Sequence, residues 1–334
     1  MEGLTDPLMR DLLSSTGEFD WCVTEFIRIT DTLLPKSAFY FACPELENGG
    51  KTAAGTPVHV QLLGNNAEML AANAVLAVEL GAPAIDLNFG CPAKTVNRHR
   101  GGSVLLDEPE VIYQLVKAVR DAVPADIPVS AKMRLGYMDR NFTLENAHAI
   151  EDAGASWLTV HARTKAEGYK PPAFWDQLRP IREAVKINVI ANGEIWNNTD
   201  AKQCQLESAC EDLMIGRGAV TTPDITLCIR QDSNQGLFSW FDLLQMQQRF
   251  LAGRTLLYGP KTTELRLLGR YKQWLAMMST HYPEAKDLWN KVKVIRVLQE
   301  AQELLKRELD RLFLAKATYS KPLESTPDQL KLKL

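Results

Sequence analysis

The chain has 334 residues, of which 46% are hydrophobic and 24% charged, and its formal net charge is −3. A chain of this length and balance can bury a large core in one large domain or in two. It contains no apolar run of the roughly 18 residues that cross a bilayer, and its first residues, MEGLTDPLMR, lack the basic and apolar regions of a secretory signal. We therefore expect a cytoplasmic protein that does not enter membranes.

The six cysteines are spread along the chain without close pairs, at positions 22, 43, 91, 204, 210 and 228. This spacing argues against a disulfide framework and against a zinc site. We expect reduced thiols, most of them small core residues, and no bound metal.

Seven short apolar runs, rich in Val, Ile and Leu, predict β-strands. They lie at 22–29, 58–64, 84–90, 129–136, 157–164, 188–194 and 212–218. Segments with helical spacing follow several of them, at 67–82, 109–123 and 143–155. Alternating strands and helices indicate a parallel sheet that is buried on both faces. Seven or eight such units in about 235 residues approach the length of a (β/α)₈ barrel.

The pattern changes after Gly236. Residues 237–259, 263–282 and 285–314 have helical spacing with no strand between them, which predicts an all-α bundle. Residues 236–334 contain 17 Lys and Arg against 10 Asp and Glu, although the whole chain is acidic. This excess favours a surface that binds a polyanion, and an ordinary solvated helix surface is the alternative. We predict a barrel domain at 1–235, a helical domain at 236–315 and a disordered tail at 316–334.

Polar residues follow six of the predicted strands. The strand ends of a barrel meet in one mouth, where barrel enzymes carry their chemistry. The residues are Gln61; Asn88 with Cys91; Lys132 with Arg134; His161 with Arg163; Asn192, Gly193 and Glu194; and Gly216, Arg217 and Gly218. Glycine-rich ends of the last two strands commonly hold a phosphate, so they predict a phosphorylated ligand.

Two residues of this set suit a redox ring. A cation and an imidazole, Lys132 and His161, would stabilise an electron-rich ring that gains negative charge on reduction. The structural alternatives are an ion pair between Lys132 and Glu194, and a histidine that is hydrogen-bonded inside the barrel.

Cys91 directly follows a strand end and precedes Pro92. A thiol with an ordinary pKa near ~8.5 is mostly protonated at neutral pH, so it can donate a proton as well as attack as a thiolate. The basic residues that follow would favour the thiolate unless they face a nucleic-acid backbone; they are Lys94, Arg98, His99 and Arg100. A small loop hydrophobe is the structural alternative.

A series of motifs resembles the tRNA-dihydrouridine synthases, and most closely their bacterial C-type branch. The motifs occur in the family's order up to about Arg296: MEGLTDPLMR (1–10), TEFIR (24–28), VQLLG (60–64), DLNFGCPAKTVN (86–97), KMRLG (132–136), VHART (160–164), IANGEIW (190–196) and MIGRG (214–218). The Asn-x-x-Cys-Pro element from Asn88 to Pro92 is highly specific within the series.

The resemblance implies an FMN-binding (β/α)₈ TIM barrel followed by a helical tRNA-binding domain. It implies reduction of the C5–C6 double bond of a uridine in the tRNA D-loop, at position 16, with NADPH as the reductant. Flavin N5 would deliver hydride to C6, and Cys91 would be the general acid that protonates C5. We expect the enzyme to be a monomer.

The resemblance also assigns binding residues. The matching FMN contacts are Met1, Gln61, Lys132, His161, Asn192, Gly193, Glu194, Gly216 and Arg217. The matching tRNA contacts are Arg28, Asn88, Tyr169, Arg270, Lys272 and Lys293, with Asn88 holding the target nucleotide.

Two features depart from the family pattern. The chain begins at the Met of the opening motif, so we expect the first barrel strand to be missing, with a start that lies upstream or a barrel that is open. Met277 and Lys293 stand where the C-type branch has tyrosine and arginine, and lysine lacks the bidentate fork of arginine.

Three other functions remain open from the sequence. They are a small-molecule flavin reductase of the dihydroorotate dehydrogenase type, a class I aldolase with Lys132 as Schiff base, and a non-enzymatic tRNA-binding protein with a truncated barrel.

Overall fold

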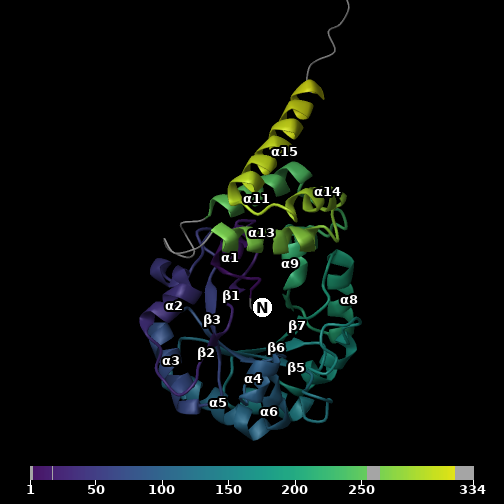
Figure 1. Cartoon of the computed structure of the whole chain (residues 1–334). Helices are drawn as coiled ribbons and strands as arrows, with labels where there is room; N and C mark the ends of the chain where they lie inside the picture. Colours follow the sequence, from purple (N-terminus) through teal and green to yellow (C-terminus); the bar gives the residue numbers. More distant parts are fainter. Residues whose placement is uncertain (1–2, 17, 254–263, 320–334) are drawn as a thin grey trace, which may run out of the picture.

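The computed structural model describes residues 3–16, 18–253 and 264–319. Within this part of the chain a curved parallel sheet is wrapped by helices on its outside, and a group of helices caps one end (Figure 1). The strands are β1 (Cys22–Val23), β2 (Ile27–Arg28), β3 (Val58–Leu63), β4 (Ile85–Phe89), β5 (Val129–Arg134), β6 (Trp157–His161), β7 (Asn188–Asn192) and β8 (Leu213–Met214). The predicted fold class, a parallel barrel-type sheet followed by a helical region, is confirmed.

The helices that follow or precede the strands lie on the outer face of the sheet or at its ends (Figure 1). They are α1 (Pro7–Ser14), α2 (Lys36–Ala42), α3 (Ala67–Glu79), α4 (Lys94–Arg98), α5 (Pro109–Ala122), α6 (Thr143–Asp152), α7 (Arg179–Ala184), α8 (Asn198–Ser208), α9 (Arg217–Thr221) and α10 (Ile225–Arg230). Short 3₁₀ helices lie at Pro44–Asn48, Gly102–Asp107 and Trp175–Leu178.

Helix α3 shows how the residues next to a helix determine where it begins and ends. Asn66 caps its start, because the side-chain oxygen accepts a hydrogen bond from the Met69 N–H at 3.1 Å. Its end lies at Leu80, and Gly81 follows with a φ of +102°, which a glycine adopts without strain. The predicted helix at 67–82 is therefore confirmed, with an end slightly earlier than predicted.

The sheet follows the chain, in the order β1, β3, β4, β5, β6, β7 and β8, and β2 also pairs with β3. Every residue of β3 is buried, as expected for a strand covered on both faces. Among the described residues β1 pairs only with β3 and β8 only with β7, so no strand bridges these two edges.

The predicted strand at 22–29 is two short strands separated by a bulge. Cys22 and Val23 pair with Val58 and His59, whereas Ile27 and Arg28 pair with Leu62 and Leu63. Three residues, Thr24 to Phe26, therefore lie opposite two residues of β3, Val60 and Gln61. The extra residue changes the direction of the neighbouring side chains. Thr24 Oγ1 accepts the Gln61 N–H at 3.0 Å, which ties the bulge to β3.

The helical region contains α11 (Trp240–Ala252), α13 (Glu264–Met278), α14 (Pro283–Val292) and α15 (Leu298–Tyr319). The segment predicted as one helix at 285–314 is thus two, because the run KVIRV (293–297), rich in β-branched residues, separates α14 from α15. The buried Trp274 of α13 donates to the Val220 carbonyl of α9 at 2.9 Å, which joins this region to the barrel. The end of α15 projects away from the body (Figure 1). Residues 316–319, predicted to belong to a disordered tail, are part of α15, and 320–334 lie outside the described residues.

No helix in the described ranges has the length and apolar character needed to cross a membrane.

An aromatic cluster links distant strands and gives the first testable prediction. The ring of His59 on β3 stacks on Trp21 at 5.3 Å and lies 5.5 Å from Trp157 of β6. His59 is buried, and its burial lowers the pKa to about 4. An unfolded histidine has a pKa near ~6.5, so below this value the unfolded state binds the proton first.

We expect the free energy of unfolding to fall as the pH drops from about 6.5 to 4, by up to about 1.4 kcal/mol per pH unit from this residue. His59→Phe should flatten that part of the profile in urea titrations at pH 7.5 and pH 5. The exposed His148 is the matched control, and equal pH profiles for His59→Phe and His148→Phe would contradict the assignment.

Candidate active site

A cavity of about 1070 Å³ lies within the curve of the sheet and extends to the C-terminal ends of its strands. Its lining contains every described residue predicted to be catalytic or to bind the cofactor: Gln61, Cys91, Lys132, His161, Asn192, Gly193, Glu194, Gly216 and Arg217. Asn88 and Tyr169 line it as well. Met1, the remaining predicted contact, lies outside the described residues.

A hydrogen-bonded row of side chains fixes Asn88 and Gln61. Gln61 Nε2 donates to Asp86 Oδ2 at 2.6 Å, and Asn88 Nδ2 donates to Gln61 Oε1 at 2.7 Å. The Ser130 hydroxyl donates to Asp86 Oδ1 at 2.6 Å. Burial raises the pKa of Asp86, which these hydrogen bonds partly oppose. The Gln61 and Asn88 side chains are thus oriented in advance of any ligand.

Asp86 is a site residue that the sequence reasoning did not single out. The available signal was an acidic residue in the middle of the apolar run AIDLNFG. Such a residue is rarely buried without partners, and here its carboxylate has two.

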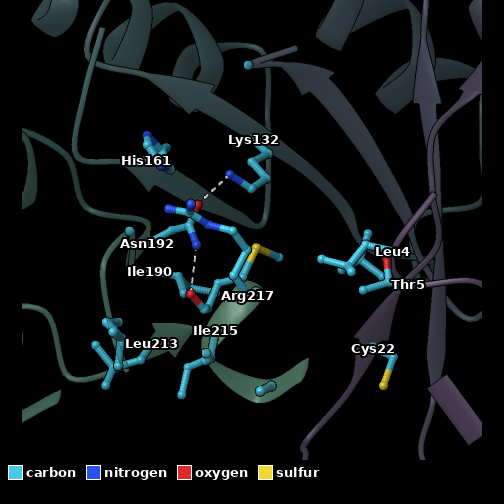
Figure 2. Close-up of a pocket in the computed structure, with 18 of the residues that line it drawn as sticks. Leu4, Thr5, Cys22, Lys132, His161, Ile190, Asn192, Leu213, Ile215 and Arg217 are labelled. Atoms are coloured by element: carbon cyan, nitrogen blue, oxygen red, sulfur yellow. Dashed lines mark hydrogen bonds between the residues drawn. The ribbon is translucent and has the colours of Figure 1, made fainter. Parts of the chain in front are cut away.

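Lys132 extends from β5 toward Asn192 at the end of β7 (Figure 2). Its amine donates to Asn192 Oδ1 at 2.8 Å, and Asn192 Nδ2 donates to the Met214 carbonyl at 2.8 Å. Burial, assisted by the nearby Arg134 cation, lowers the pKa of Lys132 to about 8, and Asp86 opposes this shift. Glu194 pairs instead with Arg217 at 2.7 Å and Arg163 at 3.0 Å.

His161 is held neutral at the same mouth. Burial, and then the positive charges of Lys132 and Arg134, push its pKa far below the ordinary value. Its Nδ1 has no hydrogen-bond partner among the described residues, so this buried polar atom is available to a ligand. A Cβ added to Gly193, whose φ is +123°, would lie 3.4 Å from His161 Nε2, so glycine keeps this wall close to the ring.

Tyr169 lies between two guanidinium groups. Arg134 and Arg217 each lie 5.1 Å from its ring centre, and Arg217 also lies 5.0 Å from the ring of Trp196. Tyr169 is nevertheless 45% exposed, so one part of its ring remains open to a partner.

The Cys91 loop is rigidly built. The Cys91 carbonyl accepts hydrogen bonds from the Ser103 hydroxyl at 2.9 Å, the Ser103 N–H at 3.2 Å and Asn97 Nδ2 at 3.0 Å. The buried Cys91 packs with Leu63 and Val96, and Phe26 of the bulge packs against them. The backbone contacts hold the thiol at the cavity wall independently of its own chemistry.

The basic side chains after Cys91 are at the surface. Lys94, Arg98 and His99 are exposed, and Arg100 pairs with Glu108 at 2.7 Å. Exposure of these basic side chains fits contacts to an external polyanion better than activation of a buried thiolate.

The predicted tRNA contacts divide into two groups. Arg28 and Lys293 are exposed, as Tyr169 is. Arg270 and Lys272 instead bond within the protein: Lys272 donates to the Lys293 and Ile295 carbonyls at 2.9 and 2.5 Å, and Arg270 binds the N-terminal segment.

Together the fold and the site define a barrel-type parallel α/β sheet with a pocket at its strand ends that contains Lys132, Arg134 and Arg217, which is the architecture of a barrel enzyme. A family model described as "Dihydrouridine synthase (Dus)" matches residues 1–312. The chain belongs to the dihydrouridine synthase family, and the family predicted from the motif series is confirmed.

Several curated relatives are similar over most of their length. The chain is 51% identical over 296 residues to the "tRNA-dihydrouridine(16) synthase" of Pseudomonas putida, covering 88% of this chain and 90% of that protein. It is 48% identical over 316 residues to the protein of the same name from Shewanella oneidensis, covering 91% and 97%.

Solved structures resemble the chain in fold alone. A 2-naphthoyl-CoA reductase complex has a TM-score of 0.53 at 12% identity, over 68% of this chain and 46% of that one. A histamine dehydrogenase from a Rhizobium species has a TM-score of 0.51 at 11% identity, over 82% and 54%.

Proposed function

We propose that the protein reduces a uridine of tRNA to 5,6-dihydrouridine, and that the uridine is position 16 of the D-loop. Family membership and the names of the relatives support the reaction and the position. The observation that carries the proposal is the joint placement of Cys91, Asn88, Lys132 and His161 on one cavity.

The residues present fit FMN as the flavin. Lys132 supplies a half-buried cation for the reduced ring, and the unpartnered His161 Nδ1 offers a further polar contact. Gln61, Asn192 and the backbone at Gly193 would hold the ring, while Gly216 and Arg217 at the start of α9 would hold the phosphate. When bound, the flavin supplies the hydride that adds to C6 of the uracil.

Cys91 then donates its thiol proton to C5 of the uracil. The resulting thiolate lies in a cavity that also contains Arg134, whose charge favours it. Asn88 orients the base, since its amide is already fixed by Gln61 and by the Gly90 N–H, which donates to Asn88 Oδ1 at 2.9 Å. The base must leave its stack in the folded tRNA to reach this wall. Basic surface residues would bind the tRNA phosphates and so offset the free-energy cost of unstacking.

We also propose NADPH as the reductant, a monomeric enzyme and a cytoplasmic location. The exposed cations after Cys91 favour an RNA substrate over the small molecule of a dihydroorotate dehydrogenase-type reductase. An aldolase role for Lys132 is disfavoured, because its amine donates to Asn192 and the nearby Asp86 carboxylate already accepts hydrogen bonds from Gln61 and Ser130. Flavin absorbance of the purified protein separates the aldolase from the flavoenzyme.

The position assignment predicts a specific change in cellular tRNA. A strain without this gene should lose dihydrouridine at position 16 and keep it at the other D-loop positions. Mapping dihydrouridine nucleotide by nucleotide in tRNA from both strains measures this. A full content at position 16 in the deletion strain would rule out the position, and loss at another position would redirect it.

A further inference from the structure

The segment before α1 forms one wall of the cavity. Leu4 and Thr5 line it, on the side opposite His161 and Asn192 (Figure 2). Each has its backbone bound by a side chain from elsewhere. The Leu4 N–H donates to Glu25 Oε1 in the bulge at 3.0 Å, and the Thr5 carbonyl accepts from Arg10 Nη1 at 2.9 Å.

Arg270 of α13 supplies the remaining attachment. Its Nε donates to Asp6 Oδ2 at 2.8 Å and its Nη2 to the Leu4 carbonyl at 2.8 Å. Its Nη1 donates to the Gly3 carbonyl and to Gln273 Oε1. The Arg270 side chain is 11% exposed and that of Asp6 8%, so this ion pair is largely removed from water. Ion pairs of this kind are costly to break from one side.

The position of α13 itself is set by other contacts. Trp274 is bound to α9 of the barrel, and Tyr271 donates its hydroxyl to Gln247 of α11 at 2.8 Å. Arg270 therefore extends from a well-anchored helix to residues 3–6, the segment before α1. Four of the five N–H groups of its guanidinium donate to protein acceptors, which leaves one at most for an RNA phosphate.

We propose that Arg270 is a positioning residue that holds the Leu4–Thr5 wall of the pocket, and that through it the helical region helps to shape the cofactor and substrate cavity. The inference rests on the proposed function only for the identity of the ligand. The family resemblance implies that Arg270 contacts tRNA, and its hydrogen bonds additionally tie it to the segment before α1.

The test uses the full-length protein and three variants. Arg270→Gln removes the charge and the fork, and Arg270→Lys keeps the charge but loses the fork. Arg266→Gln removes the same charge from an exposed position one turn earlier on α13 and is the matched control. Amide hydrogen exchange of the N-terminal peptide is measured by mass spectrometry, and FMN affinity by quenching of flavin fluorescence.

Both Arg270 variants should speed amide exchange in residues 3–9, because Arg270 binds the Leu4 carbonyl. They should also raise the FMN dissociation constant by about tenfold, which is within the usual coupling between neighbouring residues such as Arg270 and the wall that it holds. Arg266→Gln should do neither. Asp6→Asn should reproduce the effect, and its combination with Arg270→Gln should add little to it.

Two results would overturn the proposal. One is unchanged exchange in both Arg270 variants. The other concerns the slope of log tRNA affinity against log salt concentration. A slope that drops by about one unit in Arg270→Gln and recovers in Arg270→Lys, with FMN affinity unchanged in both, would identify a direct phosphate contact. If the protein binds no FMN, the proposed function fails, but the exchange comparison still decides whether Arg270 holds the wall.

Discussion

Replacing Cys91 by alanine should lower the rate of dihydrouridine formation by a factor of about 10² to 10⁴, the usual contribution of a positioned general acid. Binding of FMN and of tRNA should be retained. The reason is the loop around it: the Ser103 and Asn97 contacts reach the Cys91 carbonyl rather than the thiol, so the backbone keeps its shape without the sulfur. The measurement is the single-turnover oxidation of reduced enzyme mixed with tRNA that lacks dihydrouridine.

Cys22→Ala is the control for that experiment. Cys22 lines the same cavity, so its replacement tests whether loss of any thiol from the cavity lowers the rate (Figure 2). Its rate should stay within a few-fold of the parent. A Cys91→Ala enzyme that loses FMN would show that the residue is structural, and one that keeps its full rate would remove it from the mechanism.

The second large effect is expected for Lys132→Met. Loss of a charge-assisted contact costs about 1.5 to 3 kcal/mol, so the FMN dissociation constant should rise by roughly 10- to 150-fold. Methionine has a similar length and no charge, which limits the cavity that the change leaves. Lys202→Met, which breaks only a surface ion pair with Asp232, is the matched control and should leave the constant unchanged.

The same lysine predicts a pH dependence. With a pKa of about 8, Lys132 is charged below that pH and loses its charge above it. FMN affinity should therefore be constant from about pH 6.5 to 7.5 and weaken as the pH rises beyond 8, and this dependence should be absent in Lys132→Met. Binding by the parent protein that is flat to pH 9.5 would show that the amine does not contact the flavin.

The division of the predicted tRNA contacts changes the expected RNA surface. Arg28, Tyr169 and Lys293 remain available at the surface, whereas Arg270 and Lys272 are bound within the protein. The Lys272 amine holds carbonyls that follow α14, a contact that stabilises the turn into α15. The basic residues of the helical region are thus of two kinds. Arg270 and Lys272 bond within the protein, and others, such as Lys293, face solvent.

Much of the barrel and of its chemistry followed from local patterns. Runs of Val, Ile and Leu predicted the strands, because a strand buried on both faces must be apolar throughout. Parallel strands end at one edge, so polar residues such as Lys132 and Asn192 at their ends were expected together, and the cavity confirms that they meet.

Other features were settled only by partners distant in the chain. The bulge at Thr24–Phe26 depends on the register of β3, and the burial of Asp86 depends on Gln61 and Ser130. The sequence determined that Arg270 carries a charge on a helix. The tertiary structure decided what that charge binds, because Asp6 and the Leu4 carbonyl come within hydrogen-bond distance only after the segment before α1 has packed against α13.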